Sequence, residues 1–155
     1  MPTIAKRLTE LGITLPQPPP AVASYVPYVV TGNLVFISGQ VPVDANGKRI
    51  TGHLGQELDI AAGQKAARLC ALNVLAQLNA ACGGSLDRVE RCVKLGGFIA
   101  SAPGFYDQPK MMNGASELIQ QVFGDAGKHA RFAVGTSNLP MNVAVEVDAI
   151  FALRG

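Results

Sequence analysis

The sequence has no tryptophan, and only 6% of its residues are aromatic and 15% charged, against 48% hydrophobic. Typical globular chains are about 25% charged. A surface with so few charges favours association with a partner, and a second copy of the same chain is the simplest partner. The 155 residues are enough for one domain with its own hydrophobic core.

The sequence also lacks a large excess of one sign of charge and has no long apolar run. The net charge is +2 and the Lys and Arg residues are scattered, so the chain lacks the basic patch typical of proteins that bind nucleic acid. No apolar run approaches the roughly 20 residues needed to cross a membrane. The segment MPTIAKRLTELGI is too polar for the apolar part of a signal peptide. We therefore expect neither a membrane nor a nucleic acid as partner.

Cysteine and histidine are few and far apart. The three cysteines, Cys70, Cys82 and Cys92, form no pairing pattern, which predicts reduced thiols, a cytoplasmic location and a role in packing. His53 and His129 show no spacing typical of a metal site, and we interpret both as surface or loop residues. The sequence therefore predicts no metal site.

The N-terminal region differs from the rest of the chain. A short amphipathic helix is expected over residues 4–11, and the proline-rich stretch LPQPPPAV that follows forbids helix and predicts an extended connector. We interpret residues 1–20 as an appendage that packs on a single main domain, residues 21–155.

Hydrophobic periodicity and turn residues divide the main domain into strands and helices. The expected elements are a strand-turn-strand unit over 28–38, a helix over 58–82, a strand over 89–99, a helix over 105–123, and strands over 130–136 and 143–153. Gly96-Gly97 predicts a bulge or a close backbone approach. Two helices separated by single strands favour an α+β fold, a mixed sheet with both helices on one face.

The last two strands each carry a charged residue among small apolar ones, Arg131 and Glu146. Because neighbours in a strand point to opposite faces, Arg131 lies opposite Phe132 and Val134, which we expect to meet the helices. By the same alternation Glu146 lies opposite its apolar neighbours. On the helix-free face the two side chains could form a plain ion pair, or the planar guanidinium could bind the carboxylate of a ligand.

Four segments in order resemble the Rid family, the YjgF-like reactive-intermediate deaminases, also called the endoribonuclease L-PSP family. The segments are TGNLVFISGQVPVDANGK, ALNVLAQLNAACGGSLDRVERCVKLGGFI, PGFYDQPKMMNGASELI and ARFAVGTSNLPMNVAVEVDAIFAL. The last is the most specific, since it places an arginine, a Leu-Pro turn and an acidic strand in succession. Together they extend from about residue 21 to the C-terminus.

The resemblance implies a chorismate-mutase-like α+β fold, assembled as a homotrimer with clefts between subunits. It also implies that another strand separates those carrying Arg131 and Glu146. The implied activity is hydrolysis of reactive enamines and imines, such as 2-aminoacrylate, to 2-keto acids and ammonia. Such substrates are already reactive, so a site that holds the carboxylate and orients one water suffices without metal or cofactor.

Family positions can be carried over to this chain residue by residue. Arg131 matches the arginine that binds the substrate carboxylate, and Glu146 matches the acidic residue that positions or activates water. Tyr25, the backbone at Gly39 and Asn113 match residues that line the cleft.

The chain also departs from the family pattern. Ala133 stands where many members have cysteine, and His129 where many have proline. The N-terminal appendage and the loop over 52–58 make this a longer branch, which bears on the substrate more than on the fold.

Other functions remain open at this point. The same cleft in a trimer without catalysis would bind a small carboxylate as a sensor or regulator. An endoribonuclease or translation inhibitor would need a basic surface with aromatic stacking platforms, which the scattered charge does not offer. A chorismate mutase would need several converging cations, and only Arg131 is a clear candidate.

Overall fold

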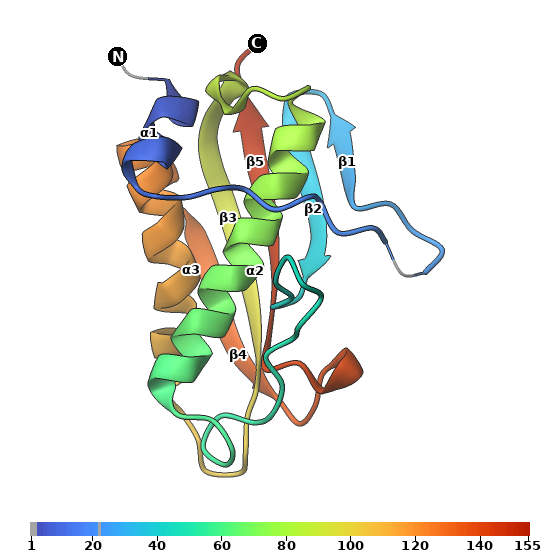
Figure 1. The fold of residues 1–155 in the computed structure, drawn as a ribbon, viewed down its shortest axis with the longest axis vertical. Helices are drawn as coiled ribbons and strands as arrows, with labels where there is room; N and C mark the ends of the chain where they lie inside the picture. Colours follow the sequence, from blue (N-terminus) through green and yellow to red (C-terminus); the bar gives the residue numbers. More distant parts are fainter. Residues whose placement is uncertain (1–2, 22) are drawn as a thin grey trace.

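The computed structural model describes residues 3–21 and 23–155, and Figure 1 shows their arrangement. The helices are α1 (Ile4–Glu10), α2 (Ile60–Ala81) and α3 (Gln108–Phe123), and the strands are β1 (Tyr28–Thr31), β2 (Leu34–Gln40), β3 (Val89–Ala100), β4 (Ala130–Thr136) and β5 (Val145–Leu153). Short 3-10 turns lie at Leu86–Arg88, Gly124–Gly127 and Pro140–Asn142. Every expected element is present, and the predicted α+β class is confirmed.

Both long helices begin a little later than the periodicity predicts, because of their first residues. Asp59 caps α2 by accepting a hydrogen bond from the N–H of Ala62 at 2.9 Å. In α3, Pro109 occupies the first turn, where its missing N–H costs nothing. Residues 105–107 therefore remain outside the helix.

The strands form one mixed sheet in the order β1-β2-β5-β3-β4. Only β3 and β4 run parallel, and α3 connects them; the other neighbours are antiparallel. Strand β3 therefore lies between the strands carrying Arg131 and Glu146, as the resemblance implied.

Helices α2 and α3 cover one face of this sheet (Figure 1). Side chains from the covered face, such as Leu95, Val147 and Phe151, are fully buried against them. On the other face the described residues place no helix, and large apolar side chains stay exposed: Val29 (51%), Phe36 (39%), Phe98 (42%) and Val134 (43%). A contiguous apolar surface of this kind marks an interaction face.

The paired glycines in β3 allow close approach rather than a bulge. A Cβ on Gly96 would overlap the Phe132 ring, and one on Gly97 would overlap the side chain of Met112. The irregularities of β3 lie nearer its start, before Arg91 and before Lys94.

The N-terminal segment packs on the main domain. In α1, Arg7 donates from Nη1 to the carbonyl of Val122 in α3 at 3.2 Å. Further along, Gln77 of α2 donates to the carbonyl of Pro19 at 2.6 Å, which fixes the proline-rich connector across the helix. No helix in residues 3–21 or 23–155 is long and apolar enough to span a membrane.

The crossing of α2 and α3 is close because Gly114 has no side chain. A Cβ there would overlap the backbone carbonyl of Gln64, whose side-chain amide donates to the carbonyl of Lys110 at 3.0 Å. Gly63 also faces α3, but its nearest neighbours are the flexible side chains of Met111 and Leu54.

We predict that Gly114→Ala lowers the free energy of unfolding by about 1–3 kcal/mol, the usual cost of overpacking. The loss should appear in urea unfolding although alanine favours helix by about 1 kcal/mol over glycine. Gly63→Ala is the matched control and should cost less, since Met111 can move aside. Equal stability of Gly114→Ala and the wild type would contradict the close crossing.

Candidate functional site

Arg131 points from β4 toward α3, so its expected place on the helix-free face is wrong. Its Nη1 donates to Asn113 Oδ1 at 3.1 Å and to Ser116 Oγ at 3.0 Å, and its Nη2 donates to the carbonyl of Pro109 at 3.1 Å. In the sheet it is level with Leu95, whose side chain is buried beneath the helices. Asn113, implied as a cleft residue, therefore does lie beside Arg131.

Phe132 and Val134, expected to meet the helices, lie on the helix-free face instead. The Phe132 ring packs edge-on against Phe98 with centroids 5.4 Å apart, and Lys94 Nζ lies 5.5 Å from its centroid. The predicted alternation of side chains along β4 is correct, but the two sets of side chains were assigned to the wrong faces of the sheet. The physical reason is that β4 is an edge strand, so its larger apolar side chains need not face the core.

Two of the N–H groups of Arg131 remain for a ligand. A guanidinium has five N–H donors, and the three hydrogen bonds to α3 use three of them. Among the described residues no carboxylate lies within ion-pair distance of this side chain. The half-buried guanidinium thus keeps its charge and a donor pair suited to a carboxylate.

Glu146 lies on the opposite face of the sheet, in β5. It is level with Phe98, and its Oε2 occupies the space that a Cβ on Gly39 would need. Burial raises the pKa of its carboxyl above the ordinary 4.5, and the neighbouring Asp148 raises it further. The pKa of Asp148 is also raised, mainly by burial. Because Arg131 and Glu146 lie on opposite faces of the sheet, they form no ion pair within one chain.

Tyr25 and Gly39 line a cavity of about 240 Å³, and Gly39 also lies against the carboxylate of Glu146, which is not part of the lining. The connector contributes Pro19 and Pro20 to its wall, and Arg49 lies at its edge. The structure thus divides the implied site residues into two groups. Tyr25, Gly39 and Glu146 form one group, and Arg131 with Asn113 forms the other, across the sheet.

The sequence interpretation missed Ser116 and His129. Ser116 Oγ lies 2.8 Å from His129 Nε2, and His129 Nδ1 lies 2.6 Å from the carbonyl of Gly127. His129 is thereby connected to Arg131 through Ser116. One signal was available: Ser116 follows Asn113 by three residues, so the two share a face of α3.

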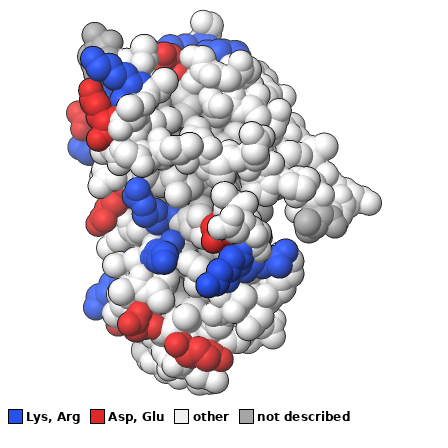
Figure 2. Space-filling view, viewed as in Figure 1, with Lys and Arg blue, Asp and Glu red and all other residues white. Residues whose placement is uncertain are grey.

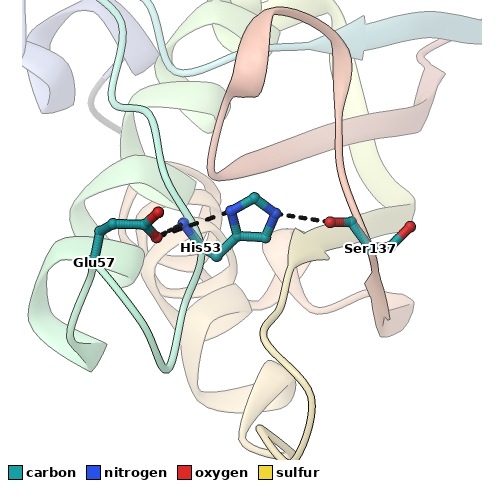
Figure 3. A network of polar contacts seen from close by, with 3 residues as sticks. All are labelled: His53, Glu57 and Ser137. Carbon is teal, nitrogen blue, oxygen red and sulfur yellow. Dashed lines mark hydrogen bonds and ion pairs between the residues drawn. The ribbon is translucent and has the colours of Figure 1, made fainter.

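His53 is a loop residue, as expected, and it fastens its loop to the turn after β4 (Figure 3). Its ring Nε2 lies 2.7 Å from the carbonyl of Ser137, and its backbone N–H donates to Glu57 Oε2 at 2.8 Å. Hydrogen bonds from the backbone N–H groups of His53 and Glu57 lower the pKa of the Glu57 carboxyl. These contacts give the 52–58 loop a fixed conformation.

The cysteines are free and buried, which confirms their packing role, and Cys70 lies close enough to Glu146 for that carboxylate to raise the pKa of its thiol. Burial raises the pKa of Cys92 to about 12 and that of Cys70 well above its usual range. Neither thiol is therefore a nucleophile in the folded chain. Across the part of the chain that the structure describes, no three His, Cys, Asp or Glu residues gather as a metal site would need.

A protein-family model described as "YjgF/chorismate mutase-like, putative endoribonuclease" matches residues 5–153, nearly the whole chain. The chain belongs to this family. The match confirms the resemblance found in the sequence, including the segment with Arg131 and Glu146.

Individual relatives cover almost the full length of the chain. Protein TCP17 of Trypanosoma cruzi is 48% identical over 152 residues, covering 97% of this chain and 94% of its own. The crystal structure of Atu1372 from Agrobacterium tumefaciens, a protein of unknown function, is 48% identical with a TM-score of 0.90, covering 98% and 94%. Escherichia coli TdcF with bound serine is 28% identical with a TM-score of 0.64, covering 90% and 94%.

Proposed function

We propose that this protein hydrolyses 2-imino acids and their enamine tautomers to 2-keto acids and ammonia. The observation that carries the proposal is the state of Arg131. Its guanidinium donates three hydrogen bonds to α3, no carboxylate among the described residues lies within ion-pair distance of it, and two N–H donors remain. Such a group binds a small carboxylate in a fixed orientation.

We further propose that each active site lies between two subunits of a homotrimer. Arg131 and Glu146 lie on opposite faces of one sheet, so a substrate bound to Arg131 of one copy meets Glu146 only from another copy. The exposed apolar side chains of the helix-free face favour packing of copies there. The number of subunits follows from the family resemblance.

The chemistry in this site is a two-stage hydrolysis. Arg131 binds the carboxylate while Glu146 takes a proton from a water whose oxygen attacks the imine carbon. Glu146 passes this proton to the imine nitrogen as its double bond to carbon opens, giving a neutral carbinolamine. Glu146 then takes the proton of the carbinolamine hydroxyl and passes it to the nitrogen, so that the carbonyl forms as the C–N bond breaks, releasing ammonia and leaving the 2-keto acid. A carboxylate whose pKa is raised by burial is a stronger base for the first stage.

The remaining residues give the site its shape. Tyr25 and the bare backbone of Gly39 form the wall beside Glu146, while Asn113 fixes Arg131. Ala133 shares the strand face of Arg131 and packs against the core. We place the protein in the cytoplasm, in agreement with its three free cysteines.

A second candidate is a carboxylate-binding protein without turnover, because TdcF was solved with bound serine. Such a protein would need Arg131 equally. Cleavage of RNA has less support: on the face drawn in Figure 2, Lys and Arg are accompanied by Asp and Glu on a mostly uncharged surface.

We predict that Arg131→Ala leaves the chain folded and assembled but reduces kcat/KM by about 100-fold or more, as expected when a charged hydrogen-bonding pair is lost. The measurement is release of ammonia and keto acid from imines generated in situ by an amino-acid oxidase. Arg91→Ala, at an exposed arginine of β3, is the matched control. Full activity of Arg131→Ala would overturn the proposal. Absence of turnover in the wild type, with 2-keto acid binding lost in Arg131→Ala, would establish the second candidate.

We predict that kcat falls as the pH drops through the pKa of Glu146, which burial holds above 4.5. The base must be ionised to accept a proton, so activity is present above this pKa and lost below it. Glu146→Gln should lower kcat more than it raises KM and should remove the acidic limb of the pH profile. Glu90→Gln, an exposed change of the same charge, should leave the profile intact. An acidic limb that persists in Glu146→Gln would assign the titration to another group.

We predict that Arg131→Ala and Glu146→Gln subunits, each of strongly reduced activity alone, regain activity when unfolded together and reassembled. In mixed oligomers some sites receive an intact Arg131 and an intact Glu146 from different subunits. Random mixing should restore about a quarter of the wild-type sites if each site uses two neighbouring subunits. No recovery in oligomers shown to be mixed would place both residues of a site in the same subunit.

A further inference from the structure

A continuous chain of hydrogen bonds runs from Arg131 into the interior between α3 and β4. Arg131 Nη1 lies 3.0 Å from Ser116 Oγ, which lies 2.8 Å from His129 Nε2. His129 Nδ1 lies 2.6 Å from the carbonyl oxygen of Gly127. All of these are within ordinary hydrogen-bond distance.

When the His129 imidazole is neutral, the two ends of this chain fix the direction of every bond in it. The carbonyl of Gly127 only accepts, so Nδ1 of His129 carries the hydrogen and Nε2 presents a lone pair. At the other end the guanidinium only donates, so Ser116 Oγ accepts from Arg131. The hydroxyl hydrogen of Ser116 is then left to donate to His129 Nε2.

We propose that His129 is a positioning residue for Arg131 and acts through Ser116. The proposal rests on the proposed function only for the role of Arg131 in binding a substrate carboxylate. His129 holds the Ser116 hydroxyl in one rotamer, so that its lone pair faces the guanidinium. Without His129, the hydroxyl of a serine within a helix is free to turn to the carbonyl four residues earlier.

The placement of the three residues supports this role. Ser116 is 6% exposed, so few waters compete for its hydroxyl. His129 precedes Arg131 by two residues, and in extended backbone such residues face the same side, here toward α3. A fixed Ser116 hydroxyl holds the guanidinium against α3 and leaves its two other donors for the ligand. The arginine side chain then loses less conformational entropy when the ligand binds.

The test compares His129→Leu, His129→Gln and Ser116→Ala with the wild type. Leucine removes the acceptor, whereas glutamine replaces it with a side-chain carbonyl at similar reach. We expect His129→Leu to raise KM for imines, and Kd for 2-oxobutanoate by calorimetry, by about 5-fold, the effect of one hydrogen bond, while kcat stays within about 2-fold. His129→Gln should restore both constants to within about 2-fold of the wild type.

The double variant His129→Leu/Ser116→Ala completes a double-mutant cycle. Because both residues act through one chain of hydrogen bonds, its KM and Kd should be no higher than those of Ser116→Ala alone. Two independent residues would instead raise these constants by the product of their separate factors. Multiplying effects, an unchanged KM in His129→Leu, or no rescue by glutamine would each overturn the proposal.

An NMR measurement tests the role of His129 independently of the proposed function. In a chain labelled with ¹⁵N-histidine, His129 should carry its hydrogen on Nδ1 and none on Nε2. The Nη1 hydrogens of Arg131, which bond to Asn113 and Ser116, should exchange slowly with water in the wild type and in His129→Gln, and at least about 5-fold faster in His129→Leu. These readouts need no substrate, so they decide the role of His129 even if no imine is hydrolysed. A hydrogen on Nε2, or equal exchange in all three proteins, would overturn it.

Discussion

The covering of one sheet face by α2 and α3 is the constraint on which the rest of this structure depends. It buries one row of side chains across the sheet, among them Ile37, Leu95 and Ala149, and thereby fixes which residues of each strand point inward. Because the register places Arg131 level with Leu95, the guanidinium is carried to the helix side, where α3 meets it. The same register turns Glu146 to the uncovered side. The separation of the two charged groups is thus a direct result of how the helices are packed.

Arg131 owes its chemical character to its place at the edge of that layer. A guanidinium in the middle of the covered face would be deprived of water, at a large cost. On the edge strand it remains half-exposed, while Asn113, Ser116 and Pro109 supply neutral acceptors. Neutral acceptors orient the cation without cancelling its charge, whereas a carboxylate in the same place would compete with the ligand. The helix that completes the core therefore also orients the guanidinium.

Much of this fold is predictable from sequence, because turn residues and periodicity mark every element, and strand 130–136 is reproduced at both ends. Periodicity gave the helix starts less well, since the cap at Asp59 and Pro109 decide them locally. Periodicity did not predict which side chains of β4 face the helices. Small residues occur on both faces of this strand, and only its packing against α3 decides which face is covered. That another strand separates β4 from β5 came from the family resemblance rather than from the pattern. The link from Arg131 to His129 also depends on that docking, which no local pattern encodes.

The uncovered face poses an energetic problem whose solution connects assembly with chemistry. Its exposed aromatic and aliphatic side chains favour burial against another copy, but Glu146 and Asp148 lie among them, and the pKa of each is already raised by partial desolvation. Closing a second layer over two carboxylates costs more unless the new layer brings donors, water or a cation. A purely structural interface would be more stable with apolar residues at these positions. The proposed function explains why Glu146 lies on this face: the surface between subunits must keep a hydrated, basic carboxylate opposite Arg131 of a neighbouring copy. The raised pKa of Glu146 is then the cost of placing a base inside an interface and, equally, the property that makes it effective.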